Sequence, residues 1–259
     1  MSTLKIRFKF ENGSADSHVL NAYDAARALN GIARALNITL HAFLHDEVKK
    51  QGDTADGVEV LLTAPKPGSF IYEIAMQFGE LVVAGLTYDF IKHAFNEAIG
   101  NDLDDNRNEA LRTRIEPTLG ELPASLETAL LDVHRPIAQS PAMKLTVMRP
   151  RGEVLAVFDS ESIRQLQPVV VDLDGATFGH VTRYNTLSMW GKLYSLEERR
   201  VVSFQVVDEL DTAQRALITW SLHQNNVGEP GDIALHARAL KSKGSQRVKR
   251  YLVSRVERA

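Results

Sequence analysis

Apolar and charged residues alternate at the start of the chain. Over residues 4–11, Leu, Ile and Phe occupy every second position, with Lys, Arg or Glu between them. This period of two predicts a half-buried β-strand. Over residues 20–46 the apolar spacing changes to three and four, which predicts a long amphipathic helix. Gly31 lies inside this predicted helix, so we expect another element to approach its backbone closely.

Two apolar runs in residues 58–75 flank the sequence Pro-Lys-Pro-Gly at positions 65–68. Proline fixes φ and glycine permits positive φ, so this tetrad is typical of a turn. The flanking runs are rich in Val, Leu, Ile, Phe and Tyr, which suit a buried sheet. We therefore predict a β-hairpin at the centre of a sheet, with long helices covering one face of that sheet.

Further periodic segments follow this hairpin up to Pro168. Strand pairs are adjacent in sequence and helices come in groups, which favours an α+β fold over a doubly wound parallel sheet. The expected elements are helices at 78–98, 104–116, 123–138 and 160–166, and a second hairpin formed by strands 143–148 and 154–158.

After Pro168 the pattern changes to short strand candidates separated by glycines, with a single helix at 212–223. Short strands at near-regular spacing with one helix are typical of a small antiparallel β-barrel of OB or SH3 type. We therefore predict two domains, an α+β domain over residues 1–170 and a small β-barrel over 175–259. The strand candidates are 169–172, 179–184, 189–194, 201–207, 233–240 and 248–256.

Two sets of residues resemble known sequences. The GSF triplet at 68–70, followed by a long helix, resembles the N-terminal domains of uncharacterised bacterial proteins of unknown function. The segments GHVTRYN, GKLY, VVSFQVV and RYLVSRVE, all within residues 179–257, resemble the small β-barrel domain that can follow them. The resemblance implies a two-domain bacterial protein, and it implies no activity and no site residues.

Composition narrows the class of protein further. The 259 residues include no cysteine, which excludes disulfides, thiolate metal sites and a cysteine nucleophile, and indicates a reducing compartment. The first residues lack the apolar core of a signal peptide, and the most apolar window, residues 71–86, contains two Glu and one Gln. We expect a cytoplasmic protein with no membrane partner and no cofactor.

Charge is distributed unevenly along the chain. Residues 238–258 contain eight basic residues and one acidic residue, a net charge of +7, whereas the rest contains 22 basic and 32 acidic residues, a net charge of −10. A basic terminal hairpin can neutralise phosphates, and Tyr184, Trp190 or Tyr251 could stack on bases. The basic hairpin can equally have another role. Its charges can protect a sheet edge from aggregation, or the hairpin can dock onto the acidic remainder of the protein. The candidate nucleic-acid-binding residues are Arg238, Lys241, Lys243, Arg247, Lys249, Arg250 and Tyr251.

The sequence VVVDLDG at residues 169–175 resembles the first motif of haloacid-dehalogenase-type phosphatases. In those enzymes a strand ends at an aspartate nucleophile, and the second aspartate acts as acid and base beside Mg²⁺. Here Ala176 replaces the expected Thr, and only 85 residues follow Asp174, too few for the alternating strands and helices of that fold. A strand followed by an Asp-Gly turn is therefore the favoured interpretation for Asp172 to Gly175.

Two further patterns could bind metal. His41 and His45 share one face of the predicted helix, but no third ligand or catalytic Glu accompanies them. The acidic stretch that begins at Asp102 starts like a calcium loop but has Arg107 where the loop requires glycine. No P-loop and no Gly-x-Ser-x-Gly sequence is present.

We therefore expect binding rather than catalysis. The barrel would engage an anionic partner such as nucleic acid through the basic hairpin, and the α+β domain would mediate self-association or contact with another protein. A metal-dependent phosphohydrolase or nuclease using Asp172 and Asp174 or the acidic cluster at 102–105 remains an alternative, as does a structural oligomerisation protein.

Overall fold

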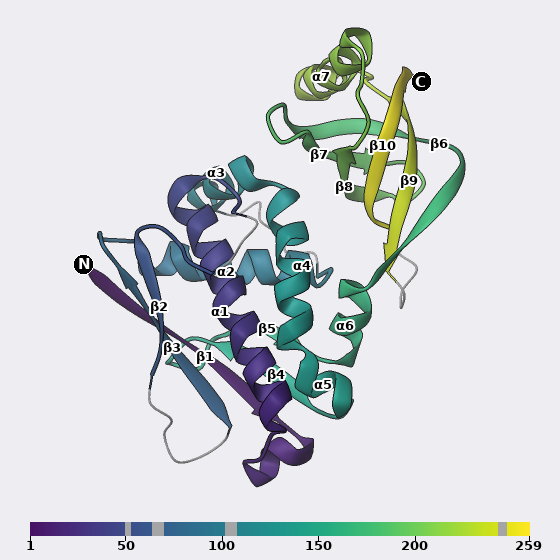
Figure 1. Ribbon diagram of the computed structural model, residues 1–259. Coiled ribbons are helices and arrows are strands. Elements are labelled where there is room, and N and C mark those ends of the chain that lie inside the picture. The colour runs from purple at the N-terminus through teal and green to yellow at the C-terminus, as the bar shows by residue number, and fades with distance from the viewer. Residues whose placement is uncertain (50–52, 64–69, 102–107, 243–247) are drawn as a thin grey trace. The chain divides into compact units, whose positions relative to one another are not determined.

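The computed structural model describes residues 1–49, 53–63, 70–101, 108–242 and 248–259. The chain forms two compact units. The first comprises Met1–Thr118 and Leu122–Leu166, and the second comprises Leu119–Glu121 and Gln167–Ala259. The fold is mixed α+β with two separate sheets, one in each unit (Figure 1).

The first unit contains an antiparallel sheet of five strands in the order β2-β3-β1-β4-β5. This order corrects the prediction that the hairpin is central. The hairpin is formed by β2 and β3, of which β2 is an edge strand, and the central strand of the sheet is β1. The predicted turn of this hairpin, at residues 65–68, lies outside the described residues. The strands are β1 (Ser2–Glu11), β2 (Val58–Leu62), β3 (Ile71–Phe78), β4 (Lys144–Met148) and β5 (Val154–Phe158).

Helices cover one face of this sheet (Figure 1). The alternation in β1 is the cause, because Ile6, Phe8 and Phe10 are at most 1% exposed and face the helices, while the charged positions between them face away. The helices are α1 (Ala22–His45), α2 (Ala84–Ala98), α3 (Glu109–Ile115), α4 (Glu121–Val133), α5 (Arg135–Gln139) and α6 (Ser160–Leu166), with 3-10 turns at Gly13–Ser17 and Glu116–Thr118.

The close approach predicted at Gly31 is present. A Cβ built on Gly31 would lie 2.6 Å from the carbonyl oxygen of Ala129 and 2.7 Å from the amide nitrogen of Val133, both in α4. Helix α1 therefore contacts α4 through backbone at this point, which only glycine permits.

One predicted helix is two helices in the structure. The pattern over 123–138 predicts a continuous helix, but α4 ends at Val133 and α5 begins at Arg135, with His134 between them. Pro136 is the cause, since proline is tolerated in the first turn of a helix but not in its interior.

The second unit contains five strands that pair in a closed cycle, β10-β8-β7-β6-β9. The prediction of a wholly antiparallel sheet is wrong for one pair, because β8 and β10 run parallel. The connection from β8 to β9 carries helix α7 (Thr212–Val227), whose N-cap is Asp211 as predicted. The strands are β6 (Pro168–Asn185), β7 (Trp190–Ser195), β8 (Arg200–Val206), β9 (Ile233–Ser242) and β10 (Val248–Arg258).

Strand β6 is longer than predicted, because the candidates at 169–172 and 179–184 form one strand of 18 residues. The Asp-Gly sequence inside it is not a chain-reversing turn. Pairing with β9 shifts between Asp172 and Ala176, and Gly175 has φ +111°. This irregularity is a bulge, in which extra residues are accommodated while the strand continues.

The second unit has its own core, which includes Val181, Leu193, Phe204, Tyr251 and Val253, each at most 2% exposed. Helix α7 contributes Ile218, which is fully buried. Among the described residues, no helix is long and apolar enough to cross a membrane.

Candidate nucleic-acid interface

The seven residues predicted to bind nucleic acid fall into three groups. Arg238 and Lys241 lie on β9, and Lys249 and Arg250 lie on β10. Lys243 and Arg247 belong to residues 243–247, outside the described part of the chain. Tyr251 lies on β10 with its side chain in the core. The basic hairpin is therefore formed by two paired strands, as the sequence predicts.

Tyr251 is a correction to the predicted set. It is 2% exposed, and its hydroxyl oxygen lies 3.2 Å from Ser195 Oγ and 3.4 Å from Thr177 Oγ1. A base could reach the ring only by opening the core of the second unit. Tyr251 is therefore a core residue whose hydroxyl is satisfied internally, and we remove it from the candidate site.

Glu197 completes the polar network around Tyr251. Burial raises the pKa of Glu197, but hydrogen bonds outweigh that effect and the pKa lies below its usual value. The Glu197 carboxylate accepts from Thr177 Oγ1 at 2.6 Å, from Ser195 Oγ at 3.0 Å and from the Phe178 amide at 3.0 Å. This network ties β6 to the end of β7, so its role is structural.

Cations align across the outer surface of the closed sheet. The register places Arg183 of β6 opposite Lys192 of β7, Lys192 opposite Ser203 of β8, and Ser203 opposite Arg250 of β10. The residues on either side of Lys192, Gly191 and Leu193, are buried, so this row faces away from the core. We call Arg183, Lys192 and Arg250 the cationic row.

Arg238 and Lys241 lie beside the cationic row on β9. Arg238 is exposed and pairs in register with Leu252 of β10 and Asp172 of β6. Lys241 is half-buried. Arg238 therefore extends the positive surface on β9, next to the carboxylate of Asp172, whereas Lys241 lies on the opposite face of the strand, the face of the buried Ala239.

The aromatic residues proposed to stack on bases are occupied within the second unit. The guanidinium carbon of Arg250 lies 4.7 Å from the centre of the Trp190 ring, and Trp190 is buried. The Tyr184 ring stacks on Phe204 with centroids 5.8 Å apart. Trp190 therefore presents no open face to a base, and Tyr184 packs against the core of the unit.

Sequence reasoning missed Arg183 and Lys192. The prediction followed the density of charge near the C-terminus, and these two residues are isolated cations in the segments GHVTRYN and GKLY. The alternation around Lys192, with apolar Leu193 beside it, gave a signal that Lys192 faces outward. Nothing in the sequence shows that Arg183 and Arg250, 67 positions apart in the chain, belong to one row.

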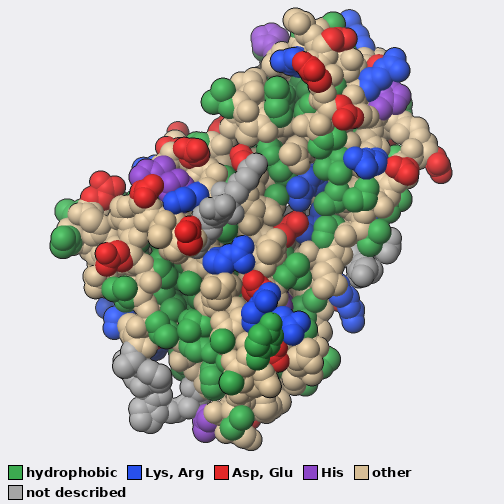
Figure 2. Space-filling model, viewed as in Figure 1, with side chains coloured by type: hydrophobic (Ala, Val, Ile, Leu, Met, Phe, Trp, Pro, Cys, Tyr) green, Lys and Arg blue, Asp and Glu red, His purple; other side chains and the backbone are tan. Residues whose placement is uncertain are grey.

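Acidic and basic side chains are interspersed over the visible surface of both units (Figure 2). The uneven charge along the sequence therefore does not produce one uniformly basic surface in this view. The case for an anionic ligand depends on local placement across neighbouring strands.

The phosphatase-like motif lacks the required setting. Asp172 and Asp174 lie within β6 at the bulge, with Arg238 opposite Asp172, and the strand continues past them. A phosphatase of that class needs its aspartates at the end of a strand. The acidic stretch at 102–107 lies outside the described residues.

The two histidines of α1 lie together, with ring centres 4.6 Å apart. Burial, and then the neighbouring His45, lower the pKa of His41, and His45 Nε2 lies 3.0 Å from the carbonyl oxygen of Asp56. Within the described ranges, no group of three or more His, Cys, Asp or Glu side chains could hold a metal ion. The pair therefore belongs to the contact between the end of α1 and residues 53–57.

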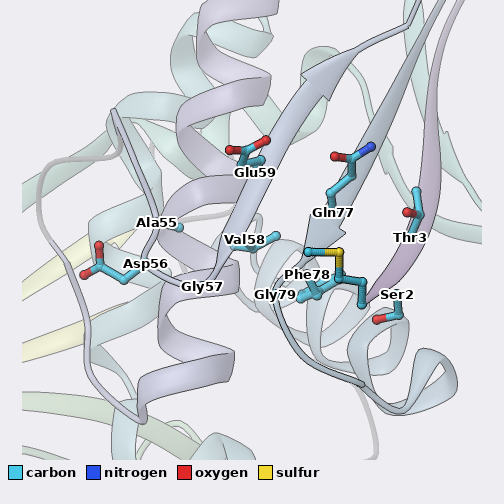
Figure 3. Close-up of a pocket in the computed structure, with 11 residues that line it drawn as sticks. Ser2, Thr3, Ala55, Asp56, Gly57, Val58, Glu59, Gln77, Phe78 and Gly79 are labelled. Atoms are coloured by element: carbon cyan, nitrogen blue, oxygen red, sulfur yellow. The ribbon is translucent and has the colours of Figure 1, made fainter.

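A pocket of about 590 Å³ lies at one end of the first unit's sheet (Figure 3). Thr3, Gln77 and Glu59 line it from the neighbouring strands β1, β3 and β2, and Asp56 adds a second carboxylate. All four side chains are exposed. An open hollow with solvated polar groups gives no basis for assigning catalysis.

Comparison with known proteins adds one match. Residues 6–105 match the model of a domain of unknown function (DUF7946). No curated protein matches the chain. No solved structure matches it either. The match lies within the first unit, agrees with the resemblance to proteins of unknown function, and brings no activity to either unit.

Proposed function

We propose that the second unit binds nucleic acid through the cationic row. The observation that carries the proposal is the direct cross-strand opposition of Arg183 and Lys192, continued to Arg250 across Ser203. A phosphate placed over this row would be attracted by cations of neighbouring strands at the same time.

A polymer suits this row better than a small anion. The cations lie on β6, β7 and β10, and the path between them through β8 follows the curved surface of the closed sheet for three strand spacings, or about 14 Å. A single phosphate or carboxylate cannot contact both ends of such a row. A polyanion gains from each contact because each neutralised phosphate releases counterions.

The closed sheet fits the OB type among the barrels predicted from the sequence. Its first three strands, β6, β7 and β8, pair in succession, one helix follows, and the fifth strand, β10, lies between the third and the fourth. OB barrels bind oligonucleotides and oligosaccharides on the face of their second and third strands. Lys192 and Ser203 lie on those strands here. This support is an analogy of fold, secondary to the charges themselves.

The test compares two double variants of the full chain. R183E/R250E reverses both ends of the row, and R164E/R255E reverses two arginines outside it, at 60% and 62% exposure. Binding of labelled DNA and RNA is followed by fluorescence anisotropy over a salt series. We expect the first variant to lose affinity and to reduce the slope of log K against log salt by about 1.4–1.8, or 0.7–0.9 per phosphate contact.

The control variant changes the net charge by the same amount, so it should keep the slope of the unmodified protein. Equal binding by the two variants would show that any affinity comes from general charge, and the cationic row would then have no role. Far-ultraviolet circular dichroism checks the fold, because Arg250 stacks on Trp190 and R250E would change the tryptophan fluorescence without any unfolding.

For the first unit we propose self-association through the edge strand β2. Its Leu61 and Leu62 are 40% and 52% exposed, and an open strand edge with apolar side chains favours pairing with another strand. Light scattering should give the mass of a dimer or larger assembly, and L62K should reduce it to one chain. A monomer at all concentrations would refute this role. The lack of cysteine supports a reducing, cytoplasmic setting for both roles.

A further inference from the structure

Two rings lie together on the outer surface of the second unit. His180 of β6 and Tyr194 of β7 are direct register partners, and their rings stack with centroids 5.3 Å apart and planes 15° apart. Both side chains are half-buried, while Leu193 and Ser195 on either side of Tyr194 are buried. The alternation places the ring pair on the same outward side as the cationic row.

Neighbouring side chains support the ring pair from both sides. Asp232 Oδ1 lies 3.5 Å from His180 Nδ1, close enough to orient the imidazole. On the other side, Val201 of β8 is the register partner of Tyr194 and is 42% exposed. Two stacked rings and an exposed valine thus form a continuous, mostly apolar strip across three strands.

The ring pair is also close to the cations. Tyr194 and Lys192 are two residues apart on β7, so their side chains emerge on one face about 6.6 Å apart along the strand. A nucleic acid whose phosphates contact Lys192 and Arg183 can therefore place a base beside Tyr194. Cations that follow the backbone, combined with aromatic side chains that stack on bases, are the usual means of binding a single strand.

We propose that Tyr194 and His180 form a base-stacking platform, and that the ligand of the second unit is single-stranded nucleic acid. This inference rests on the function proposed above and adds the form of the nucleic acid. In a duplex each base is already stacked between its neighbours, so its face cannot reach the rings. The platform therefore favours a single strand over the same sequence in duplex form.

A cross-strand aromatic pair also stabilises a sheet, so the test must separate binding from folding. The full chain is titrated with a labelled single strand of about 12 nucleotides, within the site sizes of roughly 4–16 nucleotides known for barrels of this kind. The duplex of the same sequence is titrated in parallel. The variants are Tyr194→Ala, Tyr194→Leu, which keeps apolar bulk without a ring, and Tyr194→Phe, which keeps the ring.

We expect Tyr194→Ala and Tyr194→Leu to weaken single-strand binding by about 5- to 150-fold, the effect of losing one base stack. Tyr194→Phe should retain the affinity of the unmodified protein. The salt dependence should be the same in all four proteins because no charge changes. A change in the fluorescence of Trp190 and Trp220 in Tyr194→Ala would indicate a changed fold. In that case the affinity of Tyr194→Leu is used to judge the platform.

The failures of the two proposals are distinguishable. Salt-dependent binding that Tyr194→Leu leaves unchanged would overturn the platform and leave the cationic row intact. Equal affinity for duplex and single strand would also overturn the platform. Absence of binding to either form by the unmodified chain would overturn both proposals.

Discussion

Replacing Gly31 with alanine tests the contact between α1 and α4. The new Cβ would lie 2.6 Å from Ala129 O, 2.7 Å from Val133 N and 2.9 Å from Asp132 Cβ. Favourable contacts of carbon with other heavy atoms lie at about 3.5–4.0 Å, so the helices would have to separate by roughly 0.9–1.4 Å to relieve the shortest contact. Two of the three atoms are backbone, which cannot move aside by a change of rotamer.

The magnitude follows from two opposing effects. Overpacking a well-filled interior costs about 1–3 kcal/mol. Alanine in place of glycine inside a helix returns about 1 kcal/mol. Separation of the helices also disturbs Asp132 of α4, which forms ion pairs with Arg27 and Arg34 of α1. We therefore expect G31A to lower the free energy of unfolding of the first unit by about 1–2 kcal/mol.

The measurement is urea unfolding followed by two signals. Circular dichroism at 222 nm reports mainly the first unit, which holds six of the seven described α-helices, while both tryptophans report the second. Gly85 of α2 provides the control, because its added Cβ would have no atom within 4 Å. G85A should leave stability unchanged or raise it by up to about 1 kcal/mol.

The expected result is an earlier transition in circular dichroism for G31A, with the tryptophan transition unchanged. If G31A were as stable as the unmodified protein while G85A behaved as expected, the backbone contact between α1 and α4 could not be as close as the structure shows.

Three further changes test the interior of each unit. Tyr251→Phe removes the hydroxyl that contacts Ser195 and Thr177, so tryptophan-monitored unfolding should show a loss of about 1–2 kcal/mol, with nucleic-acid affinity unchanged. Ser221→Ala leaves the buried amide of Val181 without its 2.9 Å acceptor and should cost about 1–3 kcal/mol in the same assay. Burial lowers the pKa of His134 from 6.5 to about 4, so the unfolded chain binds a proton that the folded chain does not. Stability of the first unit should therefore fall by up to about 3 kcal/mol as pH drops from about 6.5 to 4, and H134Q should flatten that dependence.

The sequence predicted local structure well where a single repeating pattern governed it. The alternation in β1, the helical spacing of α1 and the N-cap Asp211 each depend on neighbours in the chain. The order of strands in the first unit's sheet could not be predicted from such local patterns. The apolar hairpin formed by β2 and β3 resembles a sheet centre in composition, yet the other three strands, β1, β4 and β5, all lie on one side of it. Strand order depends on long-range pairing, which local composition does not encode.

The candidate site was predicted only in part, for a related reason. Charge density identified the strands β9 and β10, and Arg250 of that set belongs to the cationic row. The same reasoning grouped Tyr251 with its charged neighbours, although the alternation of a strand turns adjacent residues to opposite faces. Burial of Tyr251 follows from its partners in Thr177 and Ser195, 74 and 56 positions away. Those partners lie on β6 and β7, and they come next to Tyr251 of β10 only in the closed sheet.

A bulge in β6 determines which of its residues belongs to the cationic row. Pairing of β6 with β7 shifts between Val181 and Arg183, which makes Thr182 an extra residue in β6. Without this shift Thr182 would lie opposite Lys192, and Arg183 would lie opposite Gly191, in a row that includes the buried Phe204. A one-residue slip transfers a side chain to the other face of a sheet, and a charge in the core is costly. The extra residue thus keeps Arg183 on the outer surface beside Lys192. Bulges are common next to functional sites because they redirect a side chain in this way, and the position of this one agrees with a role for Arg183 in binding.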